Sequence, residues 1–164
     1  MPEPEMPPFG PHLVDFLQSG CSLIVGTVSA EGDPHAGRAW GLTVVADGPP
    51  TVRMVLDADD AIALDHLADR GAVAITGANV PTLRSVQLKG RAVAVEPATE
   101  VDRARARRFC DDFFADIVET DGTERALLER LVPVDYVVCL VEIDELFDQT
   151  PGPGAGAALS SETP

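Results

Sequence analysis

Several hydrogen-bonding side chains lie on segments that otherwise have the pattern of buried strands, and they are the best candidates for chemistry in this chain. In the segment TLRSVQLKG, residues 82–90, polar and apolar side chains alternate. Ser85, Gln87 and Lys89 therefore share one strand face with Arg91, and the intervening apolar residues occupy the other. A row of hydrogen-bonding groups on one face suits a polar ligand, so we take Ser85, Gln87 and Lys89 as candidate binding residues.

Two arginines and the only tryptophan extend this set to neighbouring segments. Arg38 and Trp40 are two residues apart in RAWGLT, so we expect them to share a strand face with Leu42. Arg53 lies inside the next apolar run, TVRMVL. The simpler interpretation of each residue is an exposed outer-face side chain that pairs with a surplus acid, because exposed charges are the rule.

The acidic composition excludes several classes of partner. The 164 residues include 27 acidic and 12 basic side chains, with a formal net charge of −15. Nucleic acid and anionic membrane surfaces both require a positive surface, so we expect neither as a partner. No apolar run approaches the ~20 residues of a membrane helix, and residues 1–8 lack the order of a signal peptide. We therefore expect a cytoplasmic protein.

The cysteines and histidines do not have the spacing of a metal site. The three cysteines are odd in number, far apart and flanked by apolar residues, which favours reduced thiols in the core. The three histidines show no ligand spacing with them, so we expect no bound metal. No motif for covalent catalysis is present, and the sequence identifies no catalytic acid or base.

Apolar periodicity and turn residues define the elements that must position the candidate residues. A helical period with capping residues predicts helices at 11–20, from Asp59 or Asp60 to about 70, from Thr99 onward, and at 124–131. Aliphatic and β-branched runs between turn signals predict strands at 21–29, 35–46, 51–56, 72–78, 82–96 and 135–143. This order predicts a β-dominated β+α fold, a small antiparallel barrel with added helices.

The composition predicts one folded domain between two flexible ends. We expect a disordered N-terminus at 1–10, a folded domain at 11–150 and a flexible tail at 151–164, because both ends are rich in proline or glycine. The segment GPGAGA, residues 152–157, fits a relaxed dinucleotide-binding fingerprint. That motif requires a following helix, so we interpret the segment as a loop.

The sequence resembles the split-barrel flavoproteins, the family that includes pyridoxamine 5′-phosphate oxidase and the deazaflavin-dependent reductases. Four stretches carry the resemblance in order: CSLIVGTVSAEGDPHAGRAWGLTVV, TVRMVLDADDAIALDHLADRGAVAI, TLRSVQLKGRAVAVE and FDQTPGPGAG. Together they cover most of residues 12–156. The resemblance implies a six-stranded antiparallel split β-barrel that forms a homodimer and binds FMN at the subunit interface.

The resemblance also implies roles for the candidate residues. It places Arg38 at the flavin and its phosphate, and Ser85 against the ring or the ribityl chain. Gln87 and Lys89 share the face of Ser85, and Trp40 falls where a strand residue flanks the ring.

One loop departs from the family pattern. Where the oxidases have a serine, an arginine and a lysine that hold the phosphate, this chain has LDADDAIAL. Its three aspartates are Asp57, Asp59 and Asp60. Either they close the site to phosphate, or they cap the following helix while Arg38, with Arg84 or Arg53, holds the phosphate.

The sequence therefore predicts a pyridoxamine 5′-phosphate oxidase-like, FMN-binding oxidoreductase that acts on a small substrate. One alternative keeps the barrel and changes the ligand to deazaflavin F420 or haem. Haem is the weaker of these, because the histidines lie at a terminus, a turn and a helix. The other alternative is a cofactor-free dimeric binding or regulatory protein. Pyridoxamine 5′-phosphate oxidation itself is disfavoured, since a phosphorylated substrate and cofactor would both require basic partners.

Overall fold

A computed structural model describes residues 9–159 of the protein, so residues 1–8 and 160–164 lie outside the described part. Most of the expected disordered N-terminus and the end of the expected tail fall in those two segments. The strands are β1 (Ser22–Val28), β2 (Pro34–Val44), β3 (Thr51–Asp57), β4 (Ala72–Ala78), β5 (Ser85–Pro97) and β6 (Tyr136–Asp148). The helices are α1 (Pro11–Leu17), α2 (Ala61–Asp69), α3 (Glu100–Asp121), α4 (Arg125–Leu128) and the 3₁₀ turn η1 (Glu129–Leu131).

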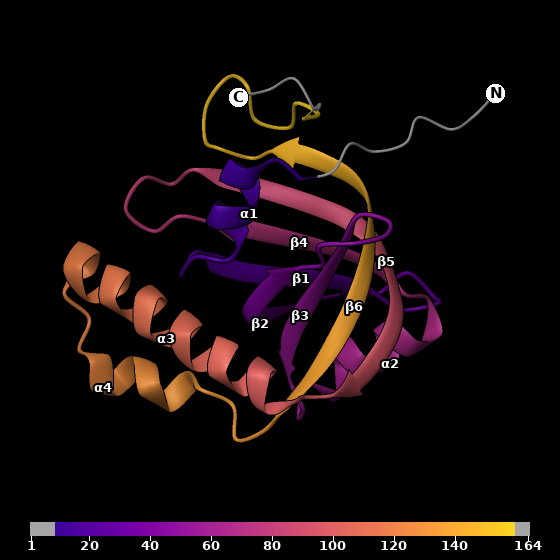
Figure 1. The fold of residues 1–164 in the computed structure, drawn as a ribbon, viewed down its shortest axis with the longest axis horizontal. Coiled ribbons are helices and arrows are strands. Elements are labelled where there is room, and N and C mark those ends of the chain that lie inside the picture. Colours follow the sequence, from indigo (N-terminus) through magenta and orange to yellow (C-terminus); the bar gives the residue numbers. More distant parts are fainter. Residues whose placement is uncertain (1–8, 160–164) are drawn as a thin grey trace.

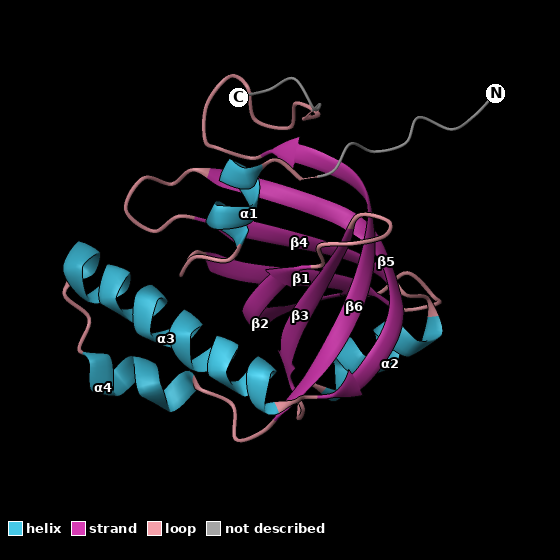
Figure 2. Cartoon of the chain, in the orientation of Figure 1, coloured by secondary structure: helices cyan, strands magenta, loops and turns pink. Residues whose placement is uncertain are grey.

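The six strands close into an antiparallel barrel in the order β1-β2-β3-β6-β5-β4. Figures 1 and 2 show α3 and α4 beside the barrel, α2 at one end of it and α1 near the opposite end. The predicted fold class, a β-dominated six-stranded antiparallel barrel with added helices, is confirmed.

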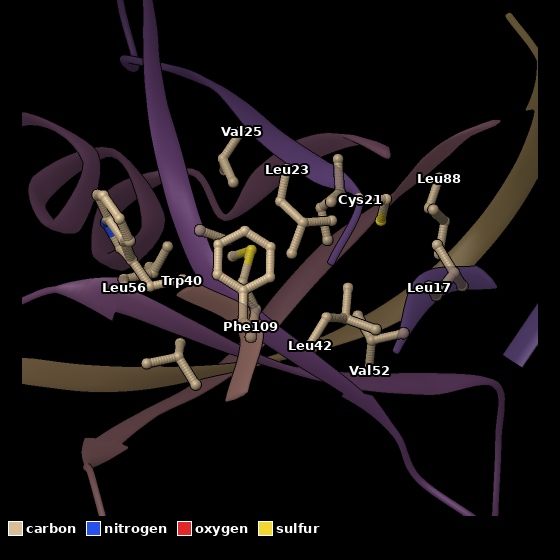
Figure 3. Close-up of a cluster of buried hydrophobic side chains, with 14 of the residues drawn as sticks. Leu17, Cys21, Leu23, Val25, Trp40, Leu42, Val52, Leu56, Leu88 and Phe109 are labelled. Atoms are coloured by element: carbon tan, nitrogen blue, oxygen red, sulfur yellow. The ribbon is translucent and has the colours of Figure 1, made fainter. Parts of the chain in front are cut away.

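The barrel interior is filled by the apolar residues that alternate along each strand. Leu23 and Val25 of β1, Ile75 of β4 and Leu88 of β5 are almost completely buried, and the facing strands contribute Val52 and others. Figure 3 shows several of these side chains in one cluster. Because a strand has a side-chain period of two, the residues between them must project outward. Those outward positions carry the candidate residues of β5.

Specific capping residues fix the helix ends. Thr99 and Asp102 form a reciprocal capping box at the start of α3, and Gly122 ends that helix in the left-handed conformation with φ 76°. Asp60 caps α2 by accepting a hydrogen bond from the backbone N–H of Ala63. The predicted N-cap at Asp59 or Asp60 is therefore confirmed at Asp60.

β6 is longer than its apolar run suggests, because its pairing with β5 continues to Asp148. β3 pairs with β6 only as far as Glu142, so the end of β6 has a free edge. The chain turns back along this overhang: Asp148 N–H donates to the Ala157 carbonyl at 2.9 Å, and Leu159 N–H donates to the Leu146 carbonyl at 2.9 Å. Residues 151–159 of the expected tail thus satisfy backbone groups that β3 leaves unpaired.

Candidate functional site

The predicted binding residues of β5 lie on the outer face of the barrel, in register with residues of three other strands. Arg38 on β2 is paired with Ile24 on β1, and Ile24 is also paired with Thr76 on β4. Thr76 is paired in turn with Gln87 on β5. Since directly paired residues of antiparallel strands project to the same face, these four residues form one row across the sheet.

The adjacent row consists of small residues and ends in Lys89. Ala36 on β2 is paired with Gly26 on β1. Gly26 is paired with Ala74 on β4, and Ala74 is paired with Lys89 on β5. No side chain longer than a methyl group rises from this row before Lys89. No large side chain here keeps a planar group from lying close to the backbone of β1 and β4.

We call this surface the four-strand face, and it consists of outward residues of β2, β1, β4 and β5. They are Ala36, Arg38, Ser22, Ile24, Gly26, Ala74, Thr76, Ala78, Ser85, Gln87 and Lys89. None of them is acidic, although the chain has 27 acidic residues. The charged residues of the face are Arg38 and Lys89, and Arg91 follows on the same side of β5, so the face favours a ligand that carries an anionic group.

Arg38 is the member of this face best placed to bind an anion. Its side chain is exposed and makes no ion pair with any residue between 9 and 159. Its guanidinium carbon lies 5.9 Å from the centroid of the Phe113 ring of α3. Stacking on an aromatic ring orients the guanidinium without neutralising it, so its N–H groups can donate to a phosphate or carboxylate.

Gln87 belongs to a short chain of amide and hydroxyl groups. Its Nε2 donates to Thr76 Oγ1 at 3.1 Å, and its Oε1 accepts from Gln149 Nε2 at 3.5 Å. These contacts hold the side chain of Gln87 along the sheet surface. A ligand on this face would therefore meet a polar edge whose orientation is set in advance.

Ser85 lies on the same face but is covered by the chain that follows β6. Only 8% of Ser85 is exposed. Its N–H donates to Thr150 Oγ1 at 3.0 Å, and its hydroxyl donates to the Leu83 carbonyl at 2.9 Å. The hydroxyl expected to contact the flavin is thus already used within the chain.

Trp40 lies in the core and not on the open surface. It is 5% exposed and packs edge-to-face against Phe109 of α3, with ring centroids 6.4 Å apart (Figure 3). Alternation along the strand predicted Arg38, Trp40 and Leu42 on one face. That alternation is wrong for Leu42, because a bulge between Ala39 and Leu42 turns Leu42 to the opposite side from Arg38.

Arg53 is separated from the four-strand face and serves as a structural ion pair. Its Nε and Nη2 donate to Asp102 at 2.7 and 2.8 Å, and its Nη1 donates to Glu96 at 3.0 Å. The hydrogen bonds from Arg53 are the main reason that the pKa of Asp102 lies well below its usual value. Asp102 in turn keeps the pKa of Arg53 above its usual value. Arg53 joins β3 to the start of α3.

Two aspartates of the loop before α2 accept hydrogen bonds from the backbone. Asp57 accepts from the backbone N–H of Asp59 at 2.9 Å. Asp60 accepts from Ala63 N–H at 3.1 Å and also contacts His35 Nε2 at 3.0 Å. Asp60 is therefore the N-cap of α2, whereas Asp57 stabilises the turn before it.

The sequence analysis did not identify the histidine contacts at this end of the barrel. Besides the pair of His35 with Asp60, Thr27 Oγ1 lies 3.0 Å from His66 Nδ1, and the two histidine rings meet edge-on at 6.2 Å. These contacts join residues 25 and 39 positions apart in the chain. No local pattern encodes such pairs, so only the fold could show them.

The remaining reactive groups do not form a second site. Residues 9–159 contain no cluster of three or more histidine, cysteine, aspartate or glutamate side chains arranged to hold a metal ion. Cys21, Cys110 and Cys139 are buried free thiols, and burial raises the pKa of each to about 11. They are therefore protonated and unreactive near neutral pH. Within the same part of the chain, no helix has the length and apolar character needed to cross a membrane.

Comparison with known proteins yields similarity in structure only. No protein-family model and no curated protein matches the sequence. An FMN-binding protein from Syntrophomonas wolfei has a TM-score of 0.53 at 11% identity, covering 82% of each chain. An F420 reductase has a TM-score of 0.51 at 16% identity, covering 80% of this chain and 93% of its own.

A third protein of the same fold is HutZ, the haem storage protein of Vibrio cholerae. Its TM-score is 0.50 at 19% identity, covering 87% of this chain and 95% of its own. These similarities confirm the expected split-barrel fold. They do not indicate which ligand this chain binds, because the three proteins are named for three different ligands: FMN, F420 and haem.

Proposed function

We propose that this protein is a cytoplasmic, FMN-binding oxidoreductase of the pyridoxamine 5′-phosphate oxidase-like type that acts on a small substrate. The observation that carries the proposal is the four-strand face. It has only small side chains in the row from Ala36 to Ala74, its residues include no acid although the chain is strongly acidic, and its Arg38 makes no ion pair with any residue between 9 and 159. A ligand with a planar ring and an anionic group matches all three properties.

The residues of this face have separate roles in the proposed complex. Arg38 would hold the phosphate, because its guanidinium is exposed and lacks an acidic partner among the described residues. The row from Gly26 to Ala74 would support the ring, and Gln87 with Thr76 would supply its polar edge. Bound FMN would supply the hydride chemistry, and the protein would position the ring and exclude water.

We further propose that the four-strand face is completed by a second copy of the chain. Ile24 lies near its centre and is 38% exposed, between Arg38 and Thr76 in its own row and beside the small residues of the adjacent row. Covering this surface would shield the ring of a bound cofactor from solvent on its second side. Light scattering should give twice the mass of one chain, and a monomer at all concentrations would contradict the dimer.

A cofactor-free binding or regulatory protein is the second candidate, and the loop before α2 favours it. Asp57, Asp59 and Asp60 replace the basic phosphate-binding residues that the family resemblance leads us to expect there. F420 in place of FMN would use the same four-strand face. Haem is less well supported, since His35 and His66 already contact Asp60 and Thr27.

The test is a flavin titration of the purified protein. Binding to the protein should shift the visible spectrum of FMN and quench the fluorescence of FMN, and both changes should saturate. Replacing Arg38 with Ala should weaken binding by about 1.5–3 kcal/mol, the value of a hydrogen bond to a charged group. The matched control is Arg130→Ala, which removes an arginine from η1, away from this face. If FMN causes no saturable change, the cofactor-free candidate replaces our proposal.

A further inference from the structure

We propose that Lys89 forms a second anion-binding position on the four-strand face and recognises a carboxylate or phosphate group of the substrate. The sequence analysis assigned Lys89 to the cofactor together with Arg38. In the structure the two cations lie on strands that are not neighbours. That the anion belongs to a substrate rests on the proposed function, whereas the binding of an anion at Lys89 can be tested by itself.

The first observation is the position of Lys89 relative to Arg38. Arg38 is on β2 and Lys89 is on β5, with β1 and β4 between them. Three interstrand spacings correspond to roughly 14 Å along the sheet. The two side chains also lie against different elements, Arg38 on Phe113 of α3 and Lys89 on Phe147 of β6, so one phosphate group does not contact both in the observed conformation. If Arg38 holds the cofactor phosphate, Lys89 remains available for a different anionic group.

The second observation is that Lys89 has an acidic neighbour and does not pair with it. Glu145 on β6 lies directly opposite Lys89 in the β5–β6 register. Lys89 nevertheless makes no ion pair with any residue of 9–159. Its Nζ lies 4.8 Å from the centroid of the Phe147 ring. The ring orients the ammonium group but leaves its charge unneutralised and its N–H donors free.

The third observation concerns the surface beside Lys89. Its partner on β4 is Ala74, and Gly26 lies beyond Ala74 on β1. Neither residue fills the space next to the ammonium group or repels an anion. Gln87, two positions earlier on β5, lies on the same face and donates to Thr76. A small anionic molecule therefore fits against Lys89, over the small residues that would also support the ring.

Lys89 is the only lysine of the chain, which allows a direct test. Protein labelled with ¹³C-lysine gives a single lysine side-chain signal by NMR. We would titrate it with benzoate, with its neutral analogue benzamide, and with inorganic phosphate, in the presence and absence of FMN. We expect a saturable shift with benzoate, phosphate or both, and none with benzamide. The responding anion identifies the carboxylate or phosphate class.

Charge variants provide the matched comparison. Glu145→Gln removes the acid opposite Lys89 and should tighten anion binding about two- to fivefold, because a nearby like charge no longer repels the anion. Glu129→Gln removes an exposed acid of η1, away from this face, and should leave the affinity unchanged.

The possible outcomes separate this inference from the proposed function. Equal shifts with benzoate and benzamide, or no saturable shift with any probe, would overturn an anion position at Lys89 even if FMN binds. If the lysine signal shifts with the anions but the protein does not bind FMN, the anion position at Lys89 is supported and the proposed cofactor is refuted.

Discussion

Arg53 shows how a charged residue on a strand can have a structural role that its position in the sequence does not reveal. Its side chain makes a two-pronged contact with Asp102, a residue 49 positions later that also caps α3. Asp102 is only 5% exposed and accepts from Thr99 as well. The sequence shows that Arg53 is a charged residue on a strand. It does not show the partner of Arg53, because that partner is set by the packing of α3 against the barrel.

Replacing Asp102 with Asn should destabilise the protein by about 2–3 kcal/mol, because it leaves the partly buried charge of Arg53 without its buried partner. Urea unfolding measures the change. The matched control is Glu96→Gln, which removes the more exposed partner of the same arginine and should cost less than about 1 kcal/mol. Equal losses in the two variants would contradict the role given to Asp102.

The same carboxylate predicts a pH dependence of stability. Its pKa is lower in the folded protein than in the unfolded chain, mainly because of the hydrogen bonds from Arg53. Such a group stabilises the fold fully above its unfolded pKa of about 4, and the contribution is lost as the pH falls toward the folded value. The stability difference between wild type and Asp102→Asn should therefore be largest near neutral pH and shrink below pH ~4. A difference that grows on acidification would contradict this assignment.

At the scale of elements, hydrophobic periodicity predicted the helices and strands in the correct order, with ends close to those observed. The departures have local causes. The β2 bulge at Ala39–Leu42 changed which face Leu42 occupies. β6 extends past 143 because β5 supplies a partner as far as Asp148, which the acidic segment DELFD did not indicate. Pairing between distant strands decided both features, so neither could be predicted from local sequence.

Gly90 is required by the close approach of β5 and β6. A Cβ atom at this position would collide with the backbone carbonyl of Glu142, at a point where the β5–β6 register shifts. Gly90→Ala should therefore destabilise the barrel by about 3 kcal/mol or more, measured by thermal or urea unfolding. Gly154→Ala is the control, because no atom of residues 9–159 lies within 4 Å of its added Cβ. Wild-type stability of Gly90→Ala would contradict the observed strand contact.

At the scale of the whole molecule, closure of the barrel creates the four-strand face. Alternation correctly predicted that Ser85, Gln87 and Lys89 share one side of β5. It could not show that Arg38 lies in the same row as Gln87, since two strands separate them. Nor could it show that residues 149–150 cover Ser85. The contacts of Trp40 with Phe109 and of Arg53 with Asp102, both in α3, were likewise not predictable from alternation. The face combines residues from four segments that are distant in sequence.

Hydrogen–deuterium exchange with and without saturating FMN tests the central claim most directly, because it reports where the ligand binds. We predict slower exchange on adding FMN in β1, in β4, in the part of β2 around Arg38 and in the 85–91 part of β5, with α4 unchanged and α3 unchanged apart from the region of Phe113, which Arg38 contacts. Added FMN that leaves these four strands unchanged, or that slows exchange only elsewhere, would contradict the four-strand face as the cofactor site.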